Sequence, residues 1–168
     1  KRAVHFAPPY RGETILWLSD LLGVHHLQLR KMVSEPLVKN IIRLRMKKES
    51  GEIKAIEKMV DVAYLMHTTA MKMARPGVVE QEIAGTIEGI ALANGGPVSF
   101  PVILSVNGQT LHNHHHGNVL SLGRMMVVDA GCEDNLHYSS DITRTVPVGG
   151  KFNARQKGIY EVVLSANM

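Results

Sequence analysis

The chain is short of cysteine, of aromatic residues and of long apolar runs, and each shortage excludes a class of protein. Because Cys132 is the only cysteine, no disulfide can form within the chain, and a reducing, cytoplasmic location is expected. Aromatic residues make up 5% of the sequence and the net charge is only +4, so nucleic acid is not an expected partner. No apolar run of about 18 residues and no signal-like start occurs, so no membrane association is expected either.

What is present is the composition of an ordinary globular protein. Of the 168 residues, 45% are hydrophobic and 20% are charged, which is enough apolar material for a real core. The sequence starts at Lys1, without an initiator methionine, and stops inside the helix-like pattern "RQKGIYEVVLSANM". We therefore expect the chain to be a fragment of a longer protein.

The amino-terminal residues read as the end of a separate domain. A short amphipathic helix is expected from about residue 13, closing near Gly23, with Trp17 and the leucines as its core. Pro36 disfavours helix just before it, so a domain boundary is expected there. Residues 1–36 are then the tail of an amino-terminal domain with its linker, and residues 37–168 belong to the next domain.

The second domain changes its hydrophobic period part-way along. Helical spacing extends over 37–74, interrupted near Ser50, and again over 80–93. Short apolar, β-branched runs follow at about 101–106, 124–131 and 136–146. Helices followed by strands predict an α+β fold in which helices cover a mostly antiparallel sheet.

Two acidic residues, Asp129 and Asp141, lie in the last two of these runs. If the runs form a hairpin centred near Asn135, the two residues are directly opposed, with Cβ atoms roughly 4.5–5.5 Å apart, and can hold the same cations. The alternative is one buried acid bonded to backbone amides and one exposed acid. The spacing alone does not choose between them.

The surrounding motifs do favour one alternative. The segments "VVDAGCE" and "SSDITRTVPVGGKF" resemble the pita-bread metallopeptidases, in particular the branch of aminopeptidase P and prolidase. The resemblance continues upstream through "MKKESGEI", "ARPGVVEQEIA" and "LH", so it covers roughly residues 36–168. It implies the first half of the pita-bread fold, with helices over a curved sheet. The leading "FAPPYRGE" resembles the end of the amino-terminal domain of these peptidases.

The resemblance also implies a function. Asp129 and Asp141 match metal ligands of a dinuclear site, and His112 matches the catalytic histidine that contacts substrate. The implied cofactors are two divalent ions, with manganese expected and cobalt or zinc as alternatives. The implied activity is hydrolysis of the Xaa-Pro bond at the amino end of peptides whose second residue is proline, by a homo-oligomer when complete. An Xaa-Pro dipeptidase, or a non-catalytic scaffold of the same fold, is the alternative.

Two departures from the family pattern affect these expectations. Asp141 follows Asp129 by twelve positions, where the family usually has one position fewer, so the turn "CEDNLHY" is expected to be enlarged. The family completes its site with a later histidine and two later glutamates, which do not occur within this sequence. The 168 residues alone are therefore expected to carry half a site and to be inactive.

Other chemically suggestive residues have simpler interpretations. His114, His115 and His116 are either solvated or in contact with substrate or metal, and only His112 matches a family position. Cys132 is expected to pack in the structure rather than to act as a nucleophile. The heptad spacing of Met59, Met66 and Met73 predicts core packing.

Overall fold

The computed structural model describes residues 3–168, which form two compact units divided between Glu49 and Ser50. The first unit holds helix α1 (Gly12–Leu22), the 3-10 helix η1 (His26–Met32) and helix α2 (Glu35–Met46). The order of the second is α3 (Ser50–Met73), α4 (Glu80–Ala93), β1 (Ile103–Ser105), β2 (Met125–Ala130), β3 (Ile142–Pro147) and α5 (Ala154–Asn167). The domain boundary expected at residue 36 stays a prediction. None of the described helices is long and apolar enough to cross a membrane.

In the first unit, α1 ends at Gly23, whose φ of 63° is the left-handed conformation that glycine adopts without strain. The predicted end of this helix is confirmed. The prediction of a core around Trp17 is wrong, because that side chain is 63% exposed and α1 buries no residue. A unit of this size has too little interior to cover a whole helix face. Pro36 lies in the first turn of α2, where its missing N–H is not needed.

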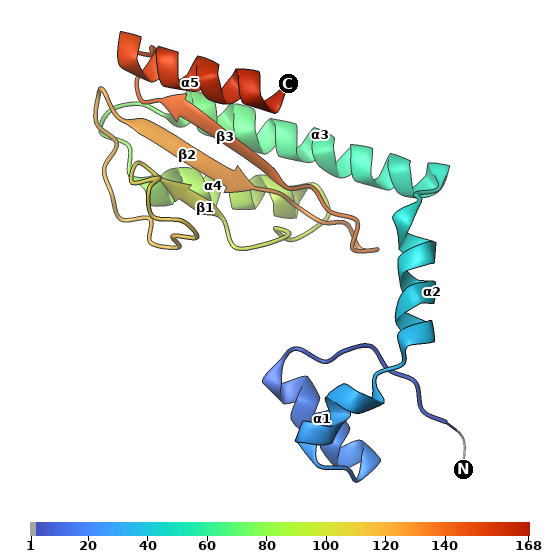
Figure 1. Ribbon diagram of the computed structural model, residues 1–168. Coiled ribbons are helices and arrows are strands. Elements are labelled where there is room, and N and C mark those ends of the chain that lie inside the picture. Colours follow the sequence, from blue (N-terminus) through green and yellow to red (C-terminus); the bar gives the residue numbers. More distant parts are fainter. Residues whose placement is uncertain (1–2) are drawn as a thin grey trace. The chain divides into compact units, whose positions relative to one another are not determined.

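The core of the second unit lies between its helices and its sheet. Helices α3 and α4 lie along one side of the strands (Figure 1), α3 against β2 and α4 against β1. Met59 and Met66 are 1% and 0% exposed on α3, so the predicted core role of the methionines is confirmed. Helix α5 buries no residue, and Val162 and Val163 are exposed on it.

The sheet is antiparallel in the order β1-β2-β3, which confirms the predicted α+β architecture. Along β2, Met126, Val128 and Ala130 are buried in the core shared with the helices. Because side chains alternate along a strand, Asp129 is turned to the opposite face, away from α3 and α4. This alternation puts an acidic side chain on the open face of an otherwise apolar strand.

The register of the β2–β3 hairpin differs from the one expected. Asp129 pairs with Thr143 rather than with Asp141, and a further bridge joins Glu133 to Ser139. The hairpin is therefore centred on Leu136 and not on Asn135, and the prediction that the two acids are directly opposed is wrong.

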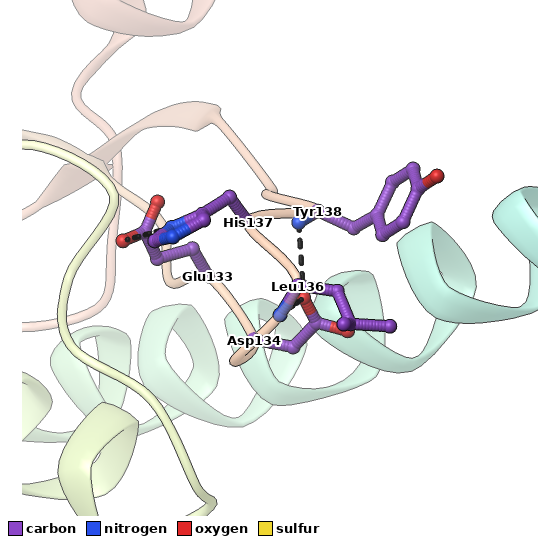
Figure 2. A network of polar contacts seen from close by, with 5 residues as sticks. All are labelled: Glu133, Asp134, Leu136, His137 and Tyr138. Atoms are coloured by element: carbon purple, nitrogen blue, oxygen red, sulfur yellow. Dashed lines mark hydrogen bonds and ion pairs between the residues drawn. The ribbon is translucent and has the colours of Figure 1, made fainter.

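The turn at the end of this hairpin explains the difference in register. In Figure 2 the Asp134 carboxylate accepts hydrogen bonds from the backbone N–H groups of Leu136, at 2.9 Å, and Tyr138, at 3.0 Å. His137 has a φ of 64°, and its ring lies 3.3 Å from the Glu133 carboxylate. An aspartate side chain that accepts hydrogen bonds from backbone groups two and four residues ahead stabilises a longer turn than the one in a hairpin centred on Asn135.

Candidate active site

The two acids of the predicted site lie on one face of the sheet. Asp141 immediately precedes β3 and shares a face with Thr143, the residue that pairs with Asp129. The acids are thus diagonal neighbours, a relation in which residues are about 7–8 Å apart and long side chains still meet.

A single cavity collects the residues that the motifs singled out. It has a volume of about 310 Å³ and is lined by Asp129, Asp141, His112 and His114, together with an apolar wall that includes Phe100. The site therefore draws on β2, on the start of β3 and on the long loop between β1 and β2. A ligand in this cavity meets two carboxylates and two imidazoles at once.

The electrostatics of the acid pair favour a bound cation. Loss of hydration, followed by the negative charge of Asp129, raises the pKa of Asp141. The Asp129 Oδ1 atom is buried and has no hydrogen-bond partner among residues 3–168. Carboxylate oxygens without donors are the ligands that hard divalent ions take, so the residues present fit such an ion.

The described residues bring few possible metal ligands together. Among residues 3–168 no group of three or more His, Cys, Asp or Glu side chains is arranged to hold a metal ion. His112 is exposed with a φ of 53°, and His116 bonds the carbonyl of Leu104 through Nδ1 at 3.1 Å. His116 is thereby tied to β1.

Glu80 holds the histidine-bearing loop, a role that sequence patterns did not reveal. It is 0% exposed at the start of α4, and its Oε1 accepts a hydrogen bond of 2.7 Å from the Val106 N–H. Its Oε2 accepts a bond of 2.9 Å from the Asn118 side chain. These two partners stand at either end of the loop that carries His112. One buried carboxylate therefore fixes both ends of that loop.

His67 supports the sheet from the other side. It lies on α3, is 4% exposed, and its Nε2 is 3.2 Å from the carbonyl oxygen of Ala130, next to Asp129. Burial lowers the pKa of His67, and within the described part of the chain its Nδ1 has no hydrogen-bond partner. The only sequence signal was a histidine within an apolar helix face.

Comparison with known proteins identifies the family of this chain. The model of metallopeptidase family M24 matches residues 54–168, well over half of the chain. The chain belongs to metallopeptidase family M24. Its family therefore implies divalent metal ions, and the predicted resemblance is confirmed.

Individual M24 relatives agree with this assignment. The Xaa-Pro aminopeptidase of Haemophilus influenzae is 34% identical over 92% of this chain and 35% of its own length. The solved structure of aminopeptidase PepP from Pseudomonas aeruginosa has a TM-score of 0.78 at 28% identity. The alignment covers 98% of this chain and 39% of the PepP chain. An Xaa-Pro dipeptidase from Bacillus anthracis has a TM-score of 0.66 at 28% identity, over 75% of this chain and 36% of its own.

These comparisons also fix the fold and the extent of the match. The solved neighbours are pita-bread proteins, so the predicted fold class is confirmed. The chain spans about a third of the length of the curated M24 relatives it matches.

Removing Glu80 is expected to loosen the histidine loop and to destabilise this M24 unit. Glu80→Ala leaves one buried and one partly buried donor without an acceptor and should lower the free energy of unfolding by about 3 kcal/mol, whereas Glu80→Gln should cost about 1 kcal/mol. Urea unfolding measures both values, and amide hydrogen exchange over residues 107–117 should speed up. Glu57→Gln, at an exposed position on α3, is the control. Equal stability of Glu80→Ala and the control would contradict the assigned role.

His67 is expected to give the M24 unit a pH-dependent stability. Its folded pKa lies below its unfolded value, so acidification below about pH 6.5 protonates the unfolded chain first. Stability is then present above that pH and is lost as the pH falls, by at most about 1.4 kcal/mol per pH unit.

The comparison of His67→Gln with the exposed-site control His115→Gln isolates this contribution. The difference in unfolding free energy between the wild type and His67→Gln should shrink between pH 7 and pH 5. A difference that stays constant over this range would show that His67 does not titrate as inferred.

Proposed function

We propose that these residues form part of a metal-dependent Xaa-Pro aminopeptidase, which removes the amino-terminal residue from peptides whose second residue is proline. The observation that carries the proposal is the cavity lined by His112, Asp129 and Asp141. Support comes also from M24 relatives that bear this name.

The three residues have distinct proposed roles. Asp129 and Asp141 hold two divalent ions, expected to be manganese, with cobalt or zinc as alternatives. Bound there, such ions would supply a water of lowered pKa and polarise the scissile carbonyl. His112 donates a hydrogen bond to the substrate at the mouth of the cavity and stabilises negative charge that develops there. Glu80 keeps the loop of His112 in place, which preorganises that donor.

The partial ligand set leads to a proposal about residues 1–168 alone. Two carboxylates without further ligands bind a cation weakly, so these residues by themselves are expected to show weak manganese binding and no peptidase activity. The full-length protein is proposed to be a cytoplasmic homo-oligomer, with the remaining ligands contributed from outside the described residues. Calorimetric titration of the 168-residue chain with manganese tests this: tight binding of two ions would refute it.

Two alternatives are kept. An Xaa-Pro dipeptidase is favoured by the likeness to the solved dipeptidase from Bacillus anthracis. The second alternative is a scaffold of the same fold that binds no metal. In such a scaffold the buried Asp129 Oδ1, which has no hydrogen-bond partner among the described residues, would also lack a metal ligand role.

Assay of the full-length protein tests the proposal. After treatment with a chelator it should be inactive, and added manganese should restore cleavage of Xaa-Pro-Yaa peptides but not of the matched Xaa-Ala-Yaa peptides. Cleavage of Xaa-Pro dipeptides alone would establish the dipeptidase. Failure to cleave any of these peptides with any of the three metals would favour the scaffold.

A further inference from the structure

A second cavity adjoins the site cavity and is larger. Its volume is about 560 Å³, against about 310 Å³ for the site cavity, and it is thus in the range of ligand-binding pockets. Phe100, Pro101 and His114 line both cavities. The two are therefore neighbouring parts of one hollow, and a molecule held beside Asp129 and Asp141 can extend into the second.

One face of α4 forms a wall of the larger cavity. Gln81, Ala84, Gly85 and Glu88 line it, at helical spacings of three and four residues. Ala84 and Gly85 have the smallest side chains of the four, so the wall is recessed between Gln81 and Glu88. A Cβ atom added at Gly85 would meet nothing within 4 Å, which shows that the space above it is free.

The segment 98–102 also lines the cavity, mostly with apolar side chains, and one acidic residue lines it as well. The segment 98–102 contributes Val98, Phe100 and Val102. Glu88 is the only Asp, Glu, Lys or Arg among the lining residues, and in the described part of the chain it has no ion-pair partner. A ligand with apolar and backbone groups and a cationic side chain complements these walls.

We propose that the larger cavity is the subsite for the residues that follow proline in a peptide substrate, and that Glu88 favours a lysine or arginine side chain there. This inference rests on the proposed function. An exopeptidase that acts at the amino end has one residue on one side of the scissile bond and the rest of the peptide on the other. The larger neighbouring space suits the longer side, so the preferred substrates are peptides longer than a dipeptide.

Filling the cavity tests the length preference in the full-length, manganese-loaded enzyme. Gly85→Phe occupies the free space, and Gly85→Ala is the matched control, because a single methyl group at this position meets nothing within 4 Å and leaves most of the cavity open. For a hexapeptide with proline second, Gly85→Phe should lower kcat/KM by about tenfold, mainly through KM. For the corresponding Xaa-Pro dipeptide the change should stay below about twofold. The control should change neither value.

Neutralising Glu88 tests the charge preference. Glu88→Gln should lower kcat/KM about tenfold for a hexapeptide with lysine after proline, and leave that of the alanine analogue unchanged. Equal effects on both peptides, or equal effects of Gly85→Phe on the hexapeptide and the dipeptide, would overturn the inference.

A binding measurement separates this inference from the proposed function. The peptide Pro-Lys-Ala-Ala contains no Xaa-Pro bond, so calorimetry with it measures occupancy without turnover. Gly85→Phe should weaken its binding about tenfold, and Gly85→Ala should not. If no Xaa-Pro peptide is cleaved but this pattern is found, the proposed function fails and the subsite stands. If peptides are cleaved and binding is unchanged in Gly85→Phe, the subsite fails alone.

Discussion

Asp129→Asn in the full-length enzyme is expected to reduce kcat/KM on Xaa-Pro-Yaa peptides by at least about a thousandfold. Asparagine keeps the shape of the side chain but removes the charge that the proposed metal pair requires. Loss of roughly 4 kcal/mol of transition-state stabilisation corresponds to that factor. Steady-state kinetics over a range of manganese concentrations measures it, and high manganese should not restore the rate.

The same substitution should not destabilise the metal-free protein. The negative charge of Asp129 is one of the causes that raise the pKa of Asp141, and removing it relieves repulsion within the folded state. Metal-free Asp129→Asn should therefore be at least as stable as the wild type in thermal unfolding. Asp61→Asn, at an exposed site on α3, should change neither activity nor stability. A large loss of metal-free stability in Asp129→Asn would mean that the residue is structural.

Gly131→Ala is expected to be the most destabilising single methyl addition in the hairpin. A Cβ atom at Gly131 would lie 1.9 Å from the carbonyl oxygen of Ser140 and 2.5 Å from its carbonyl carbon, and both are backbone atoms. Relief requires the chain at Ser140 to move away from β2, immediately before Asp141 and the start of β3. The free energy of unfolding should fall by about 3 kcal/mol or more.

The effect of this glycine substitution should reach the site. When the strands separate, Asp129 and Asp141 no longer share one cavity, so residual manganese binding should disappear even at temperatures where the variant stays folded. Gly89→Ala on α4 is the control, since its Cβ has free space and alanine favours the helix by about 1 kcal/mol. Calorimetric titration together with urea unfolding measures both effects. A Gly131→Ala variant as stable as the control would exclude the close approach.

Sequence periodicity predicted the helices and strands because it depends on local spacing. The heptad of methionines predicted the buried face of α3, and the apolar, β-branched run at 124–131 predicted β2. The pairing register of β2 and β3 could not be predicted from this spacing. It depends on the side chain of Asp134, which bonds the backbone of Leu136 and Tyr138 and shifts the centre of the hairpin by one residue. A count of residues cannot detect such a turn.

The supporting residues of the site were missed for another reason. Glu80 had the ordinary place of an acid in the first turn of a helix, where glutamate is common. Its partners Val106 and Asn118 are 26 and 38 residues away in sequence. His67 likewise bonds a residue 63 positions away. Roles that arise from contacts between distant segments leave no local pattern.

The tip of the hairpin, residues 134–138, lies beyond the bridge between Glu133 and Ser139 and beyond the ladder from Ala130 to Met125. Within the tip, Leu136 contributes a backbone N–H that donates to Asp134, while its side chain is 68% exposed. That side chain is therefore a place to graft a fluorophore or an epitope while the turn and the cavity are left as they are.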